Sequence, residues 1–221
     1  MNTPSKKKKT RPTRLRPNDK EETALLGQGY SLVAGLDEAG RGPVAGPVVA
    51  GVIILPRSLT GRWVKDIRDS KVMTRKQRED VFLHLEEEAL GFQSGAVSAL
   101  EIDDLGIVTA TRLAMTRALN SLALMPQFLL LDAFPLPDVD IPQSAIIKGD
   151  ATCLSIAAAS VVAKVTRDRM MLELDTQYPG YGFAKHKGYG TGEHMRSLEE
   201  LGPCPIHRYS FEPIKGTGAI R

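Results

Sequence analysis

Short apolar runs that alternate with amphipathic stretches constrain the fold of this chain most strongly. The runs at 32–36, 48–55 and 92–97 have the length and composition of strands, and a Gly- and Pro-rich turn joins the first two. The stretches at 75–90 and 101–124 repeat their apolar residues every three to four positions, as helices that lie on a sheet do. This alternation predicts an α/β protein with a mixed β-sheet flanked by helices.

The second half of the chain continues the pattern. It predicts strands at 128–131 and 144–147, a helix over 151–175 that is apolar at first and charged later, and a short helix at 193–201. Gly106 is placed to divide the preceding helical stretch in two. We find no internal repeat, so the chain is expected to form one domain of ordinary size with additions at its ends.

Three of the apolar runs lead directly to an acidic residue, namely Asp37, Asp132 and, after Lys148-Gly149, Asp150. Single acids often follow strands because strands end at water. Sites in open α/β sheets assemble at strand ends, however, and three acids beside Gly-rich and basic loops favour a shared site. We expect these carboxylates to meet at one edge of the sheet.

Clustered carboxylates repel one another, so a group of this kind needs a neutralising cation or a bound proton. Oxygen ligands without a convincing His or Cys partner favour Mg²⁺ or Mn²⁺ over zinc. Two such ions are the usual apparatus for phosphodiester hydrolysis. Glu38, next to Asp37, offers a further oxygen ligand.

The turn Gly40-Arg41-Gly42 follows the first acidic pair. Taken alone, a Gly-rich turn between strands is most often only a turn. Beside the carboxylates, this turn is also a candidate ligand-binding segment, because glycine lets the main chain approach a phosphate or a sugar hydroxyl closely.

At this point the sequence resembles a known family, bacterial ribonuclease HII, the type 2 ribonuclease H. The resemblance covers residues 32–215 and rests on ordered motifs along the chain: Asp37-Glu38-Ala39-Gly40-Arg41-Gly42-Pro43, Asp69-Ser70-Lys71, Asp132, Lys148-Gly149-Asp150, the run from Ala158 to Asp168, and His186-Lys187-Gly188-Tyr189.

The resemblance implies a ribonuclease-H-like mixed β-sheet with a C-terminal helical extension. It also implies an endoribonuclease that uses Mg²⁺ or Mn²⁺ to cut the RNA strand of RNA/DNA hybrids, and to cut 5′ of single ribonucleotides in duplex DNA. The matched metal-binding and catalytic carboxylates are Asp37, Glu38, Asp132 and Asp150.

The resemblance further assigns the substrate contacts. Gly40, Arg41 and Gly42 meet the ribonucleotide and its 2′-hydroxyl, and Tyr189 stacks on the sugar of the following deoxynucleotide. The 2′-hydroxyl is the group that distinguishes RNA from DNA at a single position, so a protein that recognises it must contact the sugar closely. Of the basic residues, Lys71 and Lys187 lie within matched loops and are expected to contact phosphates, and Lys164 and Arg167 are weaker candidates.

Charge divides the chain unevenly. Residues 1–20 carry eight Lys or Arg and one acid, a balance of +7, whereas the other 201 residues have a balance of −4. We expect a disordered basic arm at 1–22, a catalytic domain at 23–175 and a substrate-contacting extension at 176–221. The two cysteines are too few for a disulfide framework, and no leader or spanning segment is evident, so a monomer in the cytoplasm is expected.

Three alternatives remain from the sequence. A junction resolvase of related fold would keep the acids but has no use for Gly40-Arg41-Gly42 paired with Tyr189. A non-catalytic hybrid-binding module would have lost the acids. A zinc site built from Cys204 and His207 with His186 or His194 is conceivable, although no second close ligand pair supports it.

Overall fold

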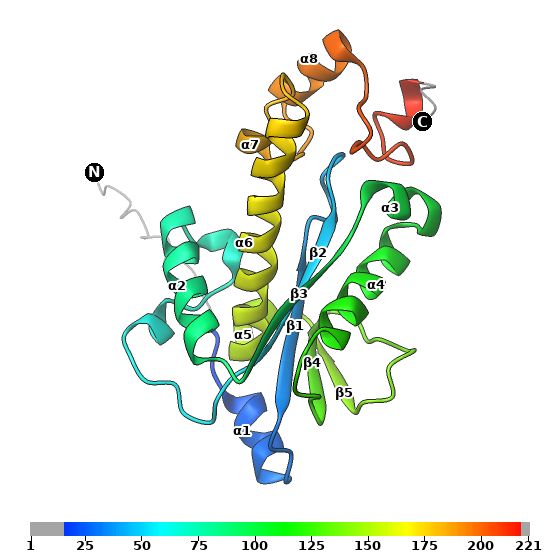
Figure 1. The fold of residues 1–221 in the computed structure, drawn as a ribbon. Coiled ribbons are helices and arrows are strands. Elements are labelled where there is room, and N and C mark those ends of the chain that lie inside the picture. The colour runs from blue at the N-terminus through cyan, green and yellow to red at the C-terminus, as the bar shows by residue number, and fades with distance from the viewer. Residues whose placement is uncertain (1–15, 218–221) are drawn as a thin grey trace, which may run out of the picture.

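A five-stranded mixed sheet forms the centre of the computed structural model, which describes residues 16–217 (Figure 1). Its order is β3-β2-β1-β4-β5. The β1–β2 and β2–β3 pairs are antiparallel, and the β1–β4 and β4–β5 pairs are parallel, which confirms the predicted mixed sheet. The strands are β1 (Val33–Ala39), β2 (Val48–Ile54), β3 (Gly91–Val97), β4 (Phe128–Asp132) and β5 (Gln143–Ile146).

Helices cover both faces of the sheet, with α6 on one face and α4 on the other (Figure 1). In the described part of the chain, no helix combines the length and apolar character that crossing a membrane would require. The α-helices are α1 (Lys20–Gly27), α2 (Arg75–Glu88), α3 (Ala99–Leu105), α4 (Ile107–Asn120), α5 (Gly149–Thr152), α6 (Leu154–Gln177), α7 (Phe183–His186) and α8 (Gly192–Leu201). Three 3₁₀ turns are η1 (Trp63–Asp66), η2 (Ser70–Val72) and η3 (Lys215–Thr217).

Glycines in the central strands let helices approach the sheet unusually closely. A Cβ added at Gly35 would lie 2.3 Å from the main chain of Ser155 in α6, and one at Gly51 would lie 2.4 Å from Ala159 O. On the opposite face, a Cβ at Gly95 would lie 2.3 Å from Ala114 O in α4. Interiors are close-packed, so these positions exclude any larger residue unless a helix moves.

Local sequence signals account for several helix boundaries. The Thr74 hydroxyl accepts from Gln77 N while the Gln77 side chain accepts from Thr74 N, which completes a capping box at the start of α2. Gly106 adopts φ 75° between α3 and α4, where a side chain would be strained, so the predicted division of this stretch is confirmed.

Several boundaries differ from the sequence prediction, and the helix predicted over 151–175 is divided at Cys153 into α5 and α6. β1 does not stop before Asp37 but continues to Ala39, because β2 is long enough to pair Asp37 with Gly51. The expected end of the basic arm at residue 22 is too late, since α1 begins at Lys20; residues 1–15 lie outside the described chain. The short α7 also was not predicted.

The N-terminal segment is tied to the start of α6. Asn18 N donates to Thr152 O at 3.0 Å, and Glu22 Oε1 accepts from Ser155 N at 2.7 Å. Glu22 thereby satisfies a main-chain donor in the first turn of α6, as a capping residue does.

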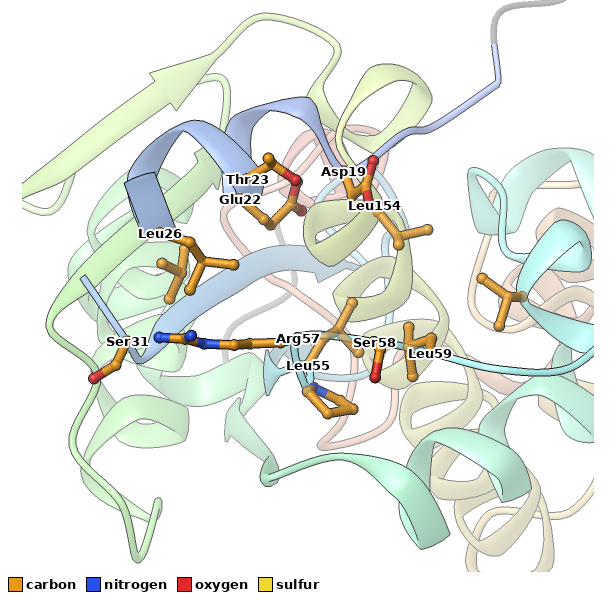
Figure 2. A pocket seen from close by; sticks show the side chains of 13 residues that line it. Asp19, Glu22, Thr23, Leu26, Ser31, Leu55, Arg57, Ser58, Leu59 and Leu154 are labelled. Atoms are coloured by element: carbon orange, nitrogen blue, oxygen red, sulfur yellow. The ribbon is translucent and has the colours of Figure 1, made fainter. Parts of the chain in front are cut away.

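A cavity of about 320 Å³ borders this contact, and Figure 2 shows Glu22 and Arg57 among its lining side chains. Val33 and Leu55 also line it, which places it at the end of β1 opposite to Asp37.

Candidate active site

The four predicted acidic residues come together at one edge of the sheet. Leu36 pairs with Leu131 in the parallel β1–β4 ladder, so Asp37 and Asp132, each one residue further along, lie on neighbouring strands. Asp150 follows β5, in the short helix α5. Gly149 N donates to Asp132 Oδ1 at 2.8 Å, which holds the start of α5 against the end of β4.

Burial makes the negative charge at this edge costly. Asp37 is 2% exposed, and burial, followed by the charges of Glu38 and Asp132, raises its pKa well above the usual range. Burial also raises the pKa of Glu38. For Asp132, burial and then the charge of Asp150 raise the pKa. The positive charge near the cluster therefore compensates only part of its negative charge.

Lys71 supplies part of that charge. Its Nζ lies 3.0 Å from Asp150 Oδ2 and 4.0 Å from Asp69 Oδ1. Partial burial alone would lower the pKa of Lys71, but the hydrogen bond to Asp150 and the charge of Asp37 outweigh burial and raise it. Lys71 stays protonated and faces the acids, consistent with its predicted place at the site.

The donor set fits a divalent cation. All four side chains offer hard oxygen atoms, and Glu38 Oε2 is buried without a hydrogen-bond partner, although Glu38 Oε1 lies 3.3 Å from Arg41 Nη1. Within residues 16–217 no three acidic, His or Cys side chains already surround a common point at ligand distance.

The Gly-rich turn and Tyr189 border the same hollow as Glu38, one of the four acids. This hollow measures about 180 Å³ and is lined by Glu38, Ala39, Gly40, Arg41, Gly42, Ser70, Lys71, Lys164, Arg167 and Tyr189. Segments separated by more than 100 residues thus contribute to one surface. Tyr189 is 47% exposed, so its ring is available to a ligand.

Two basic candidates take other roles than expected. Lys187 does not line the hollow, and its Nζ donates to Ala184 O at 2.6 Å. Arg167 is only 1% exposed and donates through Nε to Pro47 O, so it supports the turn from beneath. Lys164 lines the hollow and forms an ion pair with Asp168 at 2.6 Å.

Buried histidines support the tyrosine loop. His194 Nδ1 lies 2.9 Å from Tyr189 O, and His194 Nε2 lies 3.0 Å from His207 Nε2. Because Tyr189 O and Cys204 N have fixed roles as acceptor and donor, the chain of bonds runs from Cys204 N–H through neutral His207 and His194 to Tyr189 O. Burial and then the charge of His194 lower the pKa of His207 to about 4. Of the residues of the conceivable zinc site, Cys204, His207 and His194 are thus hydrogen-bonded to one another, whereas His186 contacts Tyr181 O and Gly188 N.

Comparison with known proteins identifies the chain. The family model described as Ribonuclease HII matches residues 34–214. The chain therefore belongs to the ribonuclease HII family. The ribonuclease HII of Dehalococcoides mccartyi is 52% identical over 204 residues, which cover 92% of this chain and 97% of that protein. The ribonuclease HII of Acetivibrio thermocellus is 50% identical over 184 residues, covering 83% of this chain and 71% of the relative.

Solved structures of related proteins superpose on this ribonuclease HII. The crystal structure of ribonuclease H2 from Pyrococcus horikoshii superposes with a TM-score of 0.69 at 31% identity, covering 84% of this chain and 96% of that chain. Ribonuclease HII in its complex with PCNA from Archaeoglobus fulgidus has a TM-score of 0.67 at 24% identity, covering 82% and 95%, and supports the fold. The predictions of a ribonuclease-H-like fold and of a ribonuclease H enzyme are confirmed.

Removing the Asp37 charge is expected to stabilise the metal-free protein. A carboxyl whose pKa is raised by folding destabilises the protein above that pKa, and this cost disappears below its ordinary pKa. In EDTA at neutral pH, Asp37→Asn should therefore unfold several degrees above the original chain, since about 1 kcal/mol corresponds to ~2–4 °C here. The difference should shrink as the pH falls through the raised pKa.

Thermal unfolding followed by circular dichroism measures this effect. Asp140→Asn, at an exposed loop position, serves as the control and should unfold with the original chain. A metal-free Asp37→Asn protein less stable than the original at neutral pH would contradict the interpretation.

Proposed function

We propose that this ribonuclease HII cuts the RNA strand of RNA/DNA hybrids and cuts 5′ of single ribonucleotides embedded in duplex DNA, leaving a 3′-hydroxyl and a 5′-phosphate. The observation that carries the proposal is the single hollow that joins the acid Glu38, the turn Gly40-Arg41-Gly42 and Tyr189. Ribonucleotide removal from DNA and degradation of primer RNA are the corresponding roles.

Asp37, Glu38, Asp132 and Asp150 are proposed to hold Mg²⁺ or Mn²⁺. When bound, such ions activate water for attack on the phosphorus and stabilise charge on the leaving oxygen. The protein contributes the placement of these carboxylates. Asp37 Oδ1 accepts from Glu38 N at 2.7 Å and Asp132 accepts from Gly149 N, so both keep one oxygen fixed and leave the other available.

The turn and the tyrosine are proposed to read sugars and not bases. Main-chain groups of Gly40, Arg41 and Gly42 approach the 2′-hydroxyl, and the Tyr189 ring stacks on the next sugar, where a hydroxyl would crowd it. Lys71 is proposed to meet a phosphate of the scissile strand, and Lys187, which faces away in the free protein, would have to turn toward the duplex. Recognition is therefore independent of sequence.

We also propose a catalytic domain that ends near residue 175 and a substrate-contacting extension from 176 to 221. The extension packs on the rest of the chain through a cluster that includes Tyr181, Phe183 and Ala45. A monomer that works in the cytoplasm is part of the same proposal; both cysteines are buried and free.

Cleavage of a DNA duplex with one ribonucleotide, incubated with Mg²⁺ or Mn²⁺, tests the function. A cut 5′ of the ribonucleotide is expected, with no cut in the matched all-DNA duplex. No cut would contradict the catalytic proposal and favour a binding module, and cleavage of all-DNA junctions would favour a resolvase.

Tyr189→Ala should reduce kcat/KM on the single-ribonucleotide duplex about tenfold more than on a long RNA/DNA hybrid. The reason is that base or sugar stacking on an aromatic ring contributes roughly 1–3 kcal/mol, and the single-ribonucleotide substrate always places a deoxyribose there. Initial rates on both substrates measure the ratio. Tyr178→Ala, outside the hollow, is the control. Equal losses on both substrates would count against the tyrosine role.

A further inference from the structure

A fully buried arginine lies directly behind the Gly-rich turn. Arg208, from the C-terminal segment, has no exposed surface. Its Nη2 donates to Gly40 O at 2.6 Å, and its Nη1 donates to Arg41 O at 2.9 Å. Nε and Nη2 also donate to Gly46 O, at 3.1 and 2.9 Å, so the guanidinium contacts both ends of the turn segment.

Burial of this cation is unfavourable by itself. Its hydrogen bonds run to main-chain oxygens and not to carboxylates, and burial, followed by the charge of Arg167, lowers the pKa of Arg208 to about 9. The charge of Asp103 acts in the opposite direction and favours the cation. A buried charge is retained only where its hydrogen bonds are well satisfied. The planar guanidinium can donate to several carbonyls in one plane, which a lysine ammonium cannot reproduce.

The geometry of the peptide bond links these contacts to the hollow. The Gly40–Arg41 and Arg41–Gly42 peptides are trans, so each N–H points opposite to the carbonyl of the preceding residue. Because Arg208 draws the carbonyls of Gly40 and Arg41 inward, the N–H groups of Arg41 and Gly42 point away from it. Both residues line the hollow, and within residues 16–217 neither N–H has an acceptor.

We propose that Arg208 is a positioning residue that orients the Arg41 and Gly42 amide groups toward the substrate sugar. The inference rests on the proposed function, since it assigns the source of order in the turn that reads the 2′-hydroxyl. Fixed donors bind an oxygen without reorganising, which is the advantage of a preorganised site. Arg208 itself does not touch the substrate.

Arg208→Lys tests the proposal, because it keeps the positive charge and removes the planar donor set. Two mispositioned amide bonds should raise KM for the single-ribonucleotide duplex at least about tenfold while kcat changes little. The dissociation constant of the matched all-DNA duplex, which offers no 2′-hydroxyl, should stay within about twofold. Arg117→Lys is the control, since Arg117 also donates to a main-chain oxygen, Ala96 O, but lies on α4 away from the hollow.

An unchanged KM, or an equal weakening of all-DNA binding, would overturn the proposal. A fall in kcat alone would also overturn it, because that pattern indicates a smaller folded fraction. Failure of the original chain to cut the single-ribonucleotide duplex would instead contradict the proposed function.

If Arg208→Lys does not unfold cooperatively, amide hydrogen exchange in the original chain decides. With Ca²⁺ present, the Arg41 and Gly42 amide protons should become protected by the single-ribonucleotide duplex and not by the all-DNA duplex. Equal protection by both duplexes, or by neither, would overturn the inference.

Discussion

Asp132→Asn should lower the cleavage rate on a single-ribonucleotide duplex by at least about a thousandfold. The substitution removes a negative charge from the edge where Asp37 and Asp150 also lie, and with it a ligand for the divalent ions. The fold should be preserved, because the amide oxygen of Asn can still accept from Gly149 N. Duplex binding should therefore remain close to that of the original chain.

Single-turnover cleavage of an end-labelled duplex in Mg²⁺ measures the loss, and binding of the same duplex in Ca²⁺ measures affinity. Asp138→Asn, in the exposed loop between β4 and β5, is the matched control and should cleave normally. Retention of more than a tenth of the original rate by Asp132→Asn would remove this residue from the proposed catalytic set.

Gly51→Ala should destabilise the protein by about 3 kcal/mol, which corresponds to a fall in Tm of roughly 10 °C for a domain of this size. The new Cβ would lie 2.4 Å from Ala159 O and 2.8 Å from Ala163 N, both main-chain atoms of α6. No side-chain rotation relieves a contact with helix backbone, so α6 must move off the sheet or β2 must bend.

Gly27→Ala provides the control for this prediction. It lies at the end of α1 with no neighbour within 4 Å of its would-be Cβ, so replacement should change Tm little or raise it slightly. Thermal unfolding of both variants is the measurement. A Gly51→Ala protein as stable as the original chain would show that α6 can shift without cost.

The sequence is most informative where a strand pattern is followed directly by an acidic residue. Strand-length apolar runs that lead to Asp37, Asp132 and Asp150 predict a common edge, and the parallel β1–β4 and β4–β5 pairings bring the ends of these runs together. Prediction succeeded because the direction of a strand fixes which end its last residue reaches.

What the sequence could not show depends on contacts between distant segments. No local sequence pattern around Arg208 shows whether its side chain is buried or exposed. Its partners in the turn lie more than 160 residues earlier. The sequence offers Arg167 only as a weaker candidate for a phosphate contact, and its burial is not predictable because a charge on a helix is normally solvated. The position of Arg208 directly after His207 is a weak signal of burial in the sequence.

The attachment of Asn18 and Glu22 to the start of α6 has a consequence for biosynthesis. These contacts join residues more than 130 positions apart, and the strand pairs of the sheet also cross long stretches of chain. Such non-local contacts slow folding. Helix α1 must therefore wait until Ser155 has left the ribosome before it can dock, so the nuclease cannot complete its fold at an earlier stage of translation.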